Sequence, residues 1–77
     1  MELKVICMTA RSATLETEAG RIFEFDTEGE VYINGSLYKR TNRVIFSLFG
    51  LRPDTEYEVC LKRDGEEART VFRTDYE

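Results

Sequence analysis

The segment around Tyr57 constrains the fold of this chain more than any other part of the sequence. Leu51 and Pro53 precede the tyrosine by six and four residues, and Val59 and Leu61 continue its alternation. Proline fixes φ and starts a turn, so a strand that begins just after this turn points Tyr57 to the interior. Its hydroxyl is then expected to bond to upstream backbone, in the tyrosine corner at which a strand of a β-sandwich begins. Leu51, Pro53 and Tyr57 are therefore predicted to be structural residues.

Turn-forming residues recur every eight to twelve residues along the chain, and no stretch shows helical periodicity. This spacing predicts an all-β fold, a sandwich or a barrel, built from short antiparallel strands. Strands are expected at 2–8, 12–18, 21–25, 30–34, 37–41, 43–49, 56–63 and 66–74.

Two dipeptides predict tight hairpins, because Asn-Gly and Asp-Gly tolerate the positive φ that two-residue turns require. They are Asn34-Gly35 and Asp64-Gly65. With the second pair as the loop, one register matches the inward positions of both strands, and a slip of one residue would ruin that match. The inward pairs are predicted to be Arg63 with Glu66, Leu61 with Ala68, Val59 with Thr70 and Tyr57 with Phe72.

Alternation along the other strands predicts which side chains form the core. Ile45, Ser47 and Phe49 are expected to face outward, because their neighbours in the sequence are the apolar residues that face inward. The predicted interior consists of Leu3, Val5, Leu15, Val31, Ile33, Val44, Phe46, Leu48 and Leu51.

Length and charge limit the size of the domain and the partners that it can bind. The 77 residues make one small domain, 1–77, which buries about 60% of its unfolded surface. The net charge of −4 and the pI of about 4.9 argue against binding to nucleic acid. The chain ends shortly after the last predicted strand, so we expect a domain excised from a longer polypeptide and a monomer when isolated.

The residue types present offer little for catalysis or cofactor binding. The chain has no histidine, which argues against most metal sites and against histidine acid–base chemistry. Alternating acids between Glu24 and Glu30 do not have the full oxygen-ligand spacing of a calcium loop. No catalytic, cofactor-binding or metal-binding residue is predicted, and the chain by itself is not expected to be an enzyme.

The two cysteines, Cys7 and Cys60, leave a choice between a disulfide and two free thiols. An immunoglobulin-type disulfide places its second cysteine two residues after the corner tyrosine, on the same face of the strand. Cys60 comes three residues after Tyr57 and so falls on the opposite face. Free thiols are the favoured prediction.

Nothing in the sequence has the length of a membrane span or the pattern of a signal peptide. The apolar run 3–8 is too short for either, and no small-residue cleavage site follows it. A cytoplasmic location is expected if Met1 is the native first residue, and the location is open if it is not.

Outward-facing aromatic and apolar side chains offer a candidate contact surface. Tyr32, Cys60 and Val71 are expected to share the outer face of the sheet that carries the last two strands, and Phe49 to face outward as well. Three interpretations stay open: ordinary scatter, docking onto another domain, and stacking on sugar rings. Tyr32, Cys60, Val71 and Phe49 form the candidate docking patch.

The run Leu51-x-Pro53-x-Thr55-Glu56-Tyr57-x-Val59, followed later by Phe72-Arg73-Thr74, resembles a fibronectin type III domain. The resemblance covers nearly the whole chain and implies an immunoglobulin-like two-sheet antiparallel β-sandwich of about seven strands. The chain departs from the pattern where Leu15-Glu16-Thr17 replaces the usual tryptophan region of the second strand. Such modules serve as spacers and interaction units, so the likeness specifies a fold better than a function.

Three stretches, TARSATLE at 9–16, VYING at 31–35 and VIFSLFGLRPDTEY at 44–57, resemble the N-terminal module of bacterial polygalacturonases. These enzymes of glycoside hydrolase family 28 degrade pectin with aspartates on a parallel β-helix, and the chain carries none of those aspartates. The resemblance implies a non-catalytic accessory module whose partner is the catalytic domain of the same polypeptide. The alternatives are an independent protein-interaction module, which recognises partners through edge strands or loops, and a carbohydrate-binding module.

Overall fold

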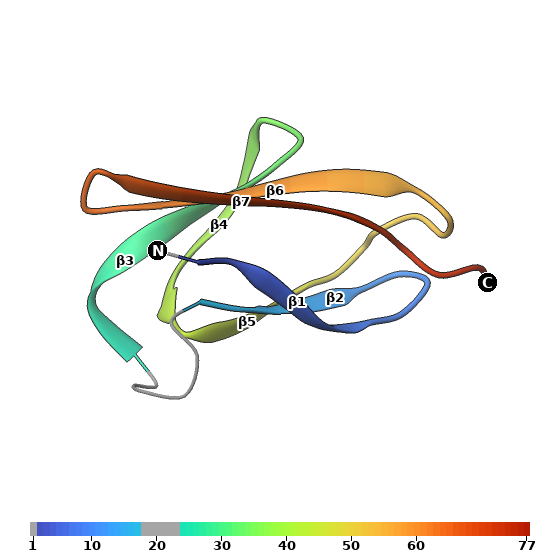
Figure 1. Cartoon of the computed structure of the whole chain (residues 1–77), viewed down its shortest axis with the longest axis horizontal. Coiled ribbons are helices and arrows are strands. Elements are labelled where there is room, and N and C mark those ends of the chain that lie inside the picture. The colour runs from blue at the N-terminus through green and yellow to red at the C-terminus, as the bar shows by residue number, and fades with distance from the viewer. Residues whose placement is uncertain (1, 18–23) are drawn as a thin grey trace.

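The computed structural model describes residues 2–17 and 24–77, which form seven β-strands in two antiparallel sheets (Figure 1). The first sheet has the order β1-β2-β5 and contains β1 (Lys4–Met8), β2 (Ala13–Glu16) and β5 (Ile45–Leu48). The second has the order β4-β3-β6-β7 and contains β3 (Glu24–Ile33), β4 (Ser36–Arg43), β6 (Glu56–Arg63) and β7 (Glu66–Arg73). The predicted all-β sandwich is confirmed. Within the described residues, no helix has the length and apolar character needed to cross a membrane.

The third strand differs from the sequence prediction. Separate strands were expected at 21–25 and 30–34, but Glu24–Ile33 is one continuous strand, and residues 21–23 lie outside the described part. Asp26 and Glu28 lie between these two segments. They are largely exposed in the structure, where the strand pairs with β4 and shifts register between Glu24 and Gly29. A bulge can absorb polar residues without ending a strand, which explains the difference.

The hairpin between β6 and β7 has the predicted register. Tyr57 pairs with Phe72, Leu61 with Ala68, and Arg63 with Glu66. The turn residues Asp64 and Gly65 have φ of 51° and 78°, the positive values expected of a tight hairpin turn. The alternation of side chains and the chemistry of the turn therefore determine this register together.

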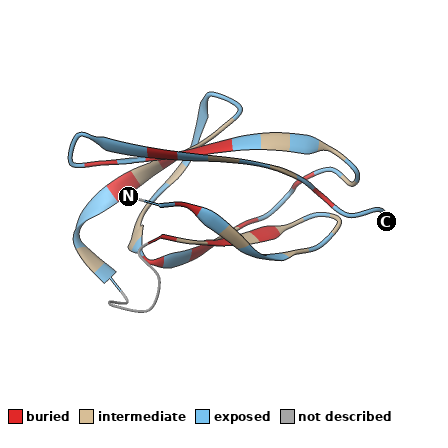
Figure 2. Ribbon diagram, viewed as in Figure 1, coloured by how far each residue is buried: buried red, intermediate tan, exposed pale blue. Residues whose placement is uncertain are grey.

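The core lies between the two sheets (Figure 2). Of the predicted interior residues, Val5 and Ile33 are only partly buried and pack against its margin. The outward positions of Ile45 and Phe49 are confirmed, since they are 46% and 65% exposed, whereas Ser47 is half-buried. Seven predicted interior residues are buried, namely Leu3, Leu15, Val31, Val44, Phe46, Leu48 and Leu51.

Gly29 lies on β3 against residues of β6, and we predict that it does not tolerate a side chain. A Cβ added there would lie 2.8 Å from Leu61 Cδ1 and 3.3 Å from the Lys62 carbonyl oxygen. Because Leu61 is buried in the core, Gly29→Ala should lower the free energy of unfolding by about 1–3 kcal/mol. Urea denaturation measures this change.

A double-mutant cycle separates that clash from backbone strain. The effect of Gly29→Ala should shrink in a Leu61→Val background, which lacks the obstructing Cδ1. Gly35→Ala is the control, because Gly35 has φ of +85° but nothing within 4 Å of its added Cβ. Its effect should be the same in both backgrounds. The prediction is contradicted if Leu61→Val leaves the effect of Gly29→Ala as unchanged as that of Gly35→Ala.

Candidate interaction surface

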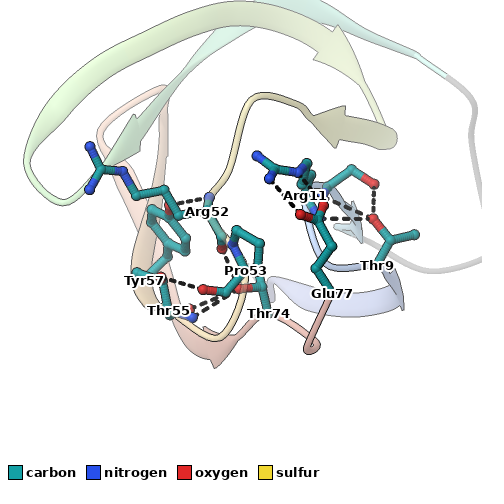
Figure 3. Close-up of polar contacts among 9 residues, drawn as sticks. Thr9, Arg11, Arg52, Pro53, Thr55, Tyr57, Thr74 and Glu77 are labelled. Carbon is teal, nitrogen blue, oxygen red and sulfur yellow. Dashed lines mark hydrogen bonds and ion pairs between the residues drawn. The ribbon is translucent and has the colours of Figure 1, made fainter.

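The corner tyrosine is bonded to the loop that precedes it (Figure 3). The Tyr57 hydroxyl accepts a hydrogen bond of 2.8 Å from the backbone N–H of Arg52. Its ring is half-buried, with its centroid 6.0 Å from that of Phe72. Leu51 is buried, and the carbonyl of half-buried Pro53 accepts a 2.8 Å bond from the Thr55 hydroxyl. This is the arrangement that a tyrosine corner requires.

Thr74 bonds the same loop from its other side, and sequence reasoning did not assign it this role. Its hydroxyl donates to the Arg52 carbonyl at 2.6 Å and accepts from the Thr55 N–H at 3.0 Å. The residue is 3% exposed. The only sequence signal was its place after Phe72 and Arg73 in the fibronectin-like run.

The residues after Thr74 are bonded to the loops at the same end of the sandwich. The Asp75 carbonyl accepts from the Asp54 N–H at 3.0 Å, and the Asp75 N–H donates to the Thr9 carbonyl at 3.3 Å. Arg11 donates to both carboxylate oxygens of Glu77, and its Nη2 lies 2.7 Å from Oε1. This pairing lowers the pKa of the Glu77 carboxyl and raises that of Arg11. The segment 74–77 therefore lies along the body of the domain.

The outer face of the four-stranded sheet is organised in rows of cross-strand neighbours. In one row the charges alternate in sign across Arg40, Glu30, Lys62 and Glu67. The guanidinium of Arg40 lies 3.2 Å from Glu30 Oε2. The next row consists of Leu37, Tyr32, Cys60 and Arg69.

An apolar stripe crosses this face. Val71 lies one step from Arg69 along the outer side of β7 and is 57% exposed. Leu37, at the opposite edge, is 47% exposed and was not among the residues predicted for the docking patch. The pairing of β3 with β4 places Leu37 beside Tyr32. We call Leu37, Tyr32, Cys60 and Val71 the outer stripe.

The residues of the predicted docking patch do not form one surface. Tyr32 is half-buried, with the Lys62 ammonium 5.0 Å from its ring centroid and its hydroxyl 3.3 Å from Glu30 Oε1. Phe49 follows β5, which belongs to the other sheet. The outer stripe thus keeps Tyr32, Cys60 and Val71 together and leaves Phe49 apart from them.

Cys60 takes the predicted outer position but is not available for contact, and this corrects the prediction. It is 7% exposed, because the longer side chains of neighbouring residues surround it. Burial raises the pKa of its thiol, and the Glu67 carboxylate raises it further. Arg69, a neighbour, lies 2.6 Å from Glu67 and lowers the pKa of that carboxyl mainly through a hydrogen bond.

Both cysteines are free, so the favoured prediction is confirmed and the alternative of a disulfide is wrong. Cys7 is exposed on the three-stranded sheet, whereas Cys60 is buried on the four-stranded one. Across residues 2–17 and 24–77, no three His, Cys, Asp or Glu side chains are grouped so that they could hold a metal ion.

Comparisons with known proteins identify the fold. No protein-family model matches the chain, and a search of curated proteins finds no match. Among solved structures, the chain is similar to the central fibronectin-III array of RIM-binding protein, with 20% sequence identity and a TM-score of 0.76. The match covers 97% of this chain and 31% of that one, so the chain spans about a third of the matched array. The likeness shows a fibronectin type III-like fold and nothing beyond the fold.

We predict that Tyr57→Phe lowers the free energy of unfolding by about 1 kcal/mol, because the Arg52 N–H loses its hydrogen-bond acceptor. Tyr38→Phe is a matched control, since the Tyr38 hydroxyl also accepts from a backbone N–H, that of Phe49 at 2.9 Å. Tyr38 is the more exposed residue, so water can replace its hydroxyl and the loss should be smaller. Urea denaturation of both variants measures the difference. An equal loss in the two would contradict a special role for Tyr57.

The pairing of Arg11 with Glu77 predicts a dependence on pH. The pKa of Glu77 is lowered in the folded state. The ion pair therefore contributes fully to the free energy of unfolding above the ordinary glutamate pKa, and this contribution is lost as pH falls through the lowered pKa. NMR titration of the Glu77 side-chain carbonyl should show this lowered pKa, and Arg11→Gln should return it to the ordinary range. Arg52→Gln is the control and should leave it unchanged. An unaltered Glu77 pKa in Arg11→Gln would contradict the pairing.

Proposed function

We propose that this chain is a non-catalytic module of a longer protein and that it docks onto another protein domain through the outer stripe. The fibronectin type III-like fold supports the role of an interaction module or spacer. The observation that carries the proposal is the stripe itself, in which exposed Leu37 and Val71 lie on the two edge strands of one face with half-buried Tyr32 between them.

The charges that flank the stripe are consistent with a largely apolar partner surface. Glu30 pairs with Arg40, and Arg69 lies 2.6 Å from Glu67 and 4.0 Å from Glu58. These charged groups already have partners within the module, so a docking domain does not need to neutralise them. An interface with an apolar centre and a polar rim has this organisation.

A protein partner is favoured over a sugar. Stacking of a sugar requires an open aromatic face, but the Lys62 ammonium lies over the ring of Tyr32. The other aromatic candidate, Phe49, follows a strand of the opposite sheet. The net charge of −4 also disfavours binding to an anionic polymer such as pectate.

The parent protein that we propose is a pectin-degrading polygalacturonase, in which the module spaces or packs on the catalytic β-helix. This part of the proposal rests on the likeness of residues 9–16, 31–35 and 44–57 to the N-terminal modules of such enzymes. The complete gene provides the test. Several hundred further codons rich in Asn, Asp and Gly, together with activity on polygalacturonic acid, are expected. A stop codon soon after that of Glu77 would refute it.

Cysteine labelling tests the docking face directly. In a Cys7→Ser background, Val71→Cys places a thiol on the outer stripe, and Ile45→Cys places one on the outer face of the other sheet. The two sites are 57% and 46% exposed, so they are closely matched. Alkylation at residue 71 should be at least tenfold slower in the complete polypeptide than in the 77-residue chain, while residue 45 should react equally in both. Equal reactivity of residue 71 in the two proteins would refute the proposed face.

A further inference from the structure

We infer that the outer edge of β7 is a pairing site for a second copy of this chain. The two β7 strands lie antiparallel about a twofold axis at Thr70, so that the two four-stranded sheets join into one continuous sheet. The inference does not depend on the proposed docking, because docking uses the face of the sheet whereas pairing uses its edge.

The two sheets of the described structure end at four strands, β1, β5, β4 and β7, and the first three carry features that hinder the addition of a strand. β1 shifts register between Val5 and Cys7, and the β3–β4 pair shifts register at two places. Such irregularities bend an edge away from an incoming strand. The edge of β5 is occupied by Lys39, whose ammonium donates to the Ser47 carbonyl at 2.7 Å. β7 is the remaining edge.

β7 is regular along its whole length. It pairs with β6 over residues 66–73 without a shift of register. A straight strand of this length presents a full row of backbone groups to an incoming strand. Charged side chains on such an edge hinder pairing unless they meet opposite charges. The charges along β7 therefore decide which strand the edge accepts.

The backbone groups of β7 that point away from β6 belong to alternate residues. The Glu58 carbonyl accepts from the Asn34 N–H at 2.8 Å, and the Glu58 N–H donates to the Asn34 side-chain oxygen at 2.9 Å. Both groups of Glu58 point away from β7, so Glu58 and Val71 form a non-hydrogen-bonded pair. Alternation then gives the outward N–H and C=O groups to Glu67, Arg69, Val71 and Arg73.

Charge selects one antiparallel register for two copies of this strand. Odd-numbered residues must lie opposite odd-numbered residues, because these carry the outward groups. With Thr70 opposite itself, Glu67 lies opposite Arg73 of the other copy and Arg69 lies opposite Val71. A shift of two residues in either direction brings arginines together, Arg69 with Arg69 or Arg69 with Arg73. Opposite charges stabilise a cross-strand pair and like charges destabilise it, so the register centred on Thr70 is favoured.

The two charged groups can form the new pair while they keep their present contacts. Both bonds from Arg73 to Asp54 use Nη1, and a guanidinium has further donors. Arg69 contacts Glu67 at Oε1, and the second carboxylate oxygen can accept from the other copy.

The edge is therefore complementary to itself. On the inner face of the joined sheet, half-buried Phe72 lies opposite Ala68 of the other copy, so apolar side chains meet there as well. A twofold axis repeats each of these contacts, as in most symmetric dimers. This self-complementarity identifies the occupant as a second copy of the chain.

Disulfide cross-linking tests the register, in a Cys7→Ser background. The twofold axis places residue 70 opposite itself in a non-hydrogen-bonded pair, with Cα atoms about 4.5 Å apart, within the range of about 4.4–6.8 Å that a disulfide spans. On oxidation, Thr70→Cys should form a covalent dimer at least tenfold faster than Val71→Cys, because residue 71 lies opposite residue 69. Val71 is exposed and Thr70 is half-buried, so random collision would favour Val71→Cys. Equal or faster cross-linking of Val71→Cys would overturn the inference.

Charge reversal tests the pairing without an added cysteine. Glu67→Lys and Arg73→Glu should each dimerise at least tenfold more weakly than the unaltered chain, because each places like charges opposite one another. An equal mixture of the two variants should regain the dimer, since the new lysine then faces the new glutamate. Sedimentation equilibrium at chain concentrations up to about 1 mM measures this association. An unaltered chain that stays monomeric, or a mixture that associates no better than either variant alone, would overturn the inference.

Discussion

The loop from Arg52 to Thr55 is the part of the structure on which the rest depends, because it carries the chain from one sheet to the other. The hydroxyl of Tyr57 binds its backbone from one side and the hydroxyl of Thr74 from the other. Since β5 belongs to the three-stranded sheet and β6 to the four-stranded one, these bonds set how the sheets are stacked. The last strand must be in place before Thr74 can bind, so the loop also couples the C-terminus to the core.

The sequence predicted those features that depend on near neighbours. The register of β6 and β7 follows from a dipeptide turn and from alternation over eight residues on each side. The buried positions of β5 follow from alternation as well. By contrast, the continuity of β3 depends on its pairing with β4 across a bulge, and the role of Thr74 depends on a loop 19 to 22 residues away. Local patterns do not contain that information.

Cys60 illustrates the same limit within the candidate surface. Alternation correctly assigned it to the face opposite Val59 and Leu61, but the face of a strand does not determine exposure. Tyr32 and Arg69 flank it in the sheet, and long side chains at these positions cover a small thiol. Leu37 shows the converse case, since it is an exposed apolar residue whose place beside Tyr32 depends on a register shift within the β3–β4 pair.

The edge of β5 is a poor site for the addition of another strand. Lys39 donates from its ammonium to the Ser47 carbonyl at 2.7 Å, and the Tyr38 hydroxyl binds the backbone of Phe49. The register shift in the β3–β4 pair places Tyr38 and Lys39 in succession beside this edge. Backbone groups satisfied by side chains are poor templates for another strand. An incoming strand would have to displace both side chains, whereas a domain that docks on the outer stripe displaces neither.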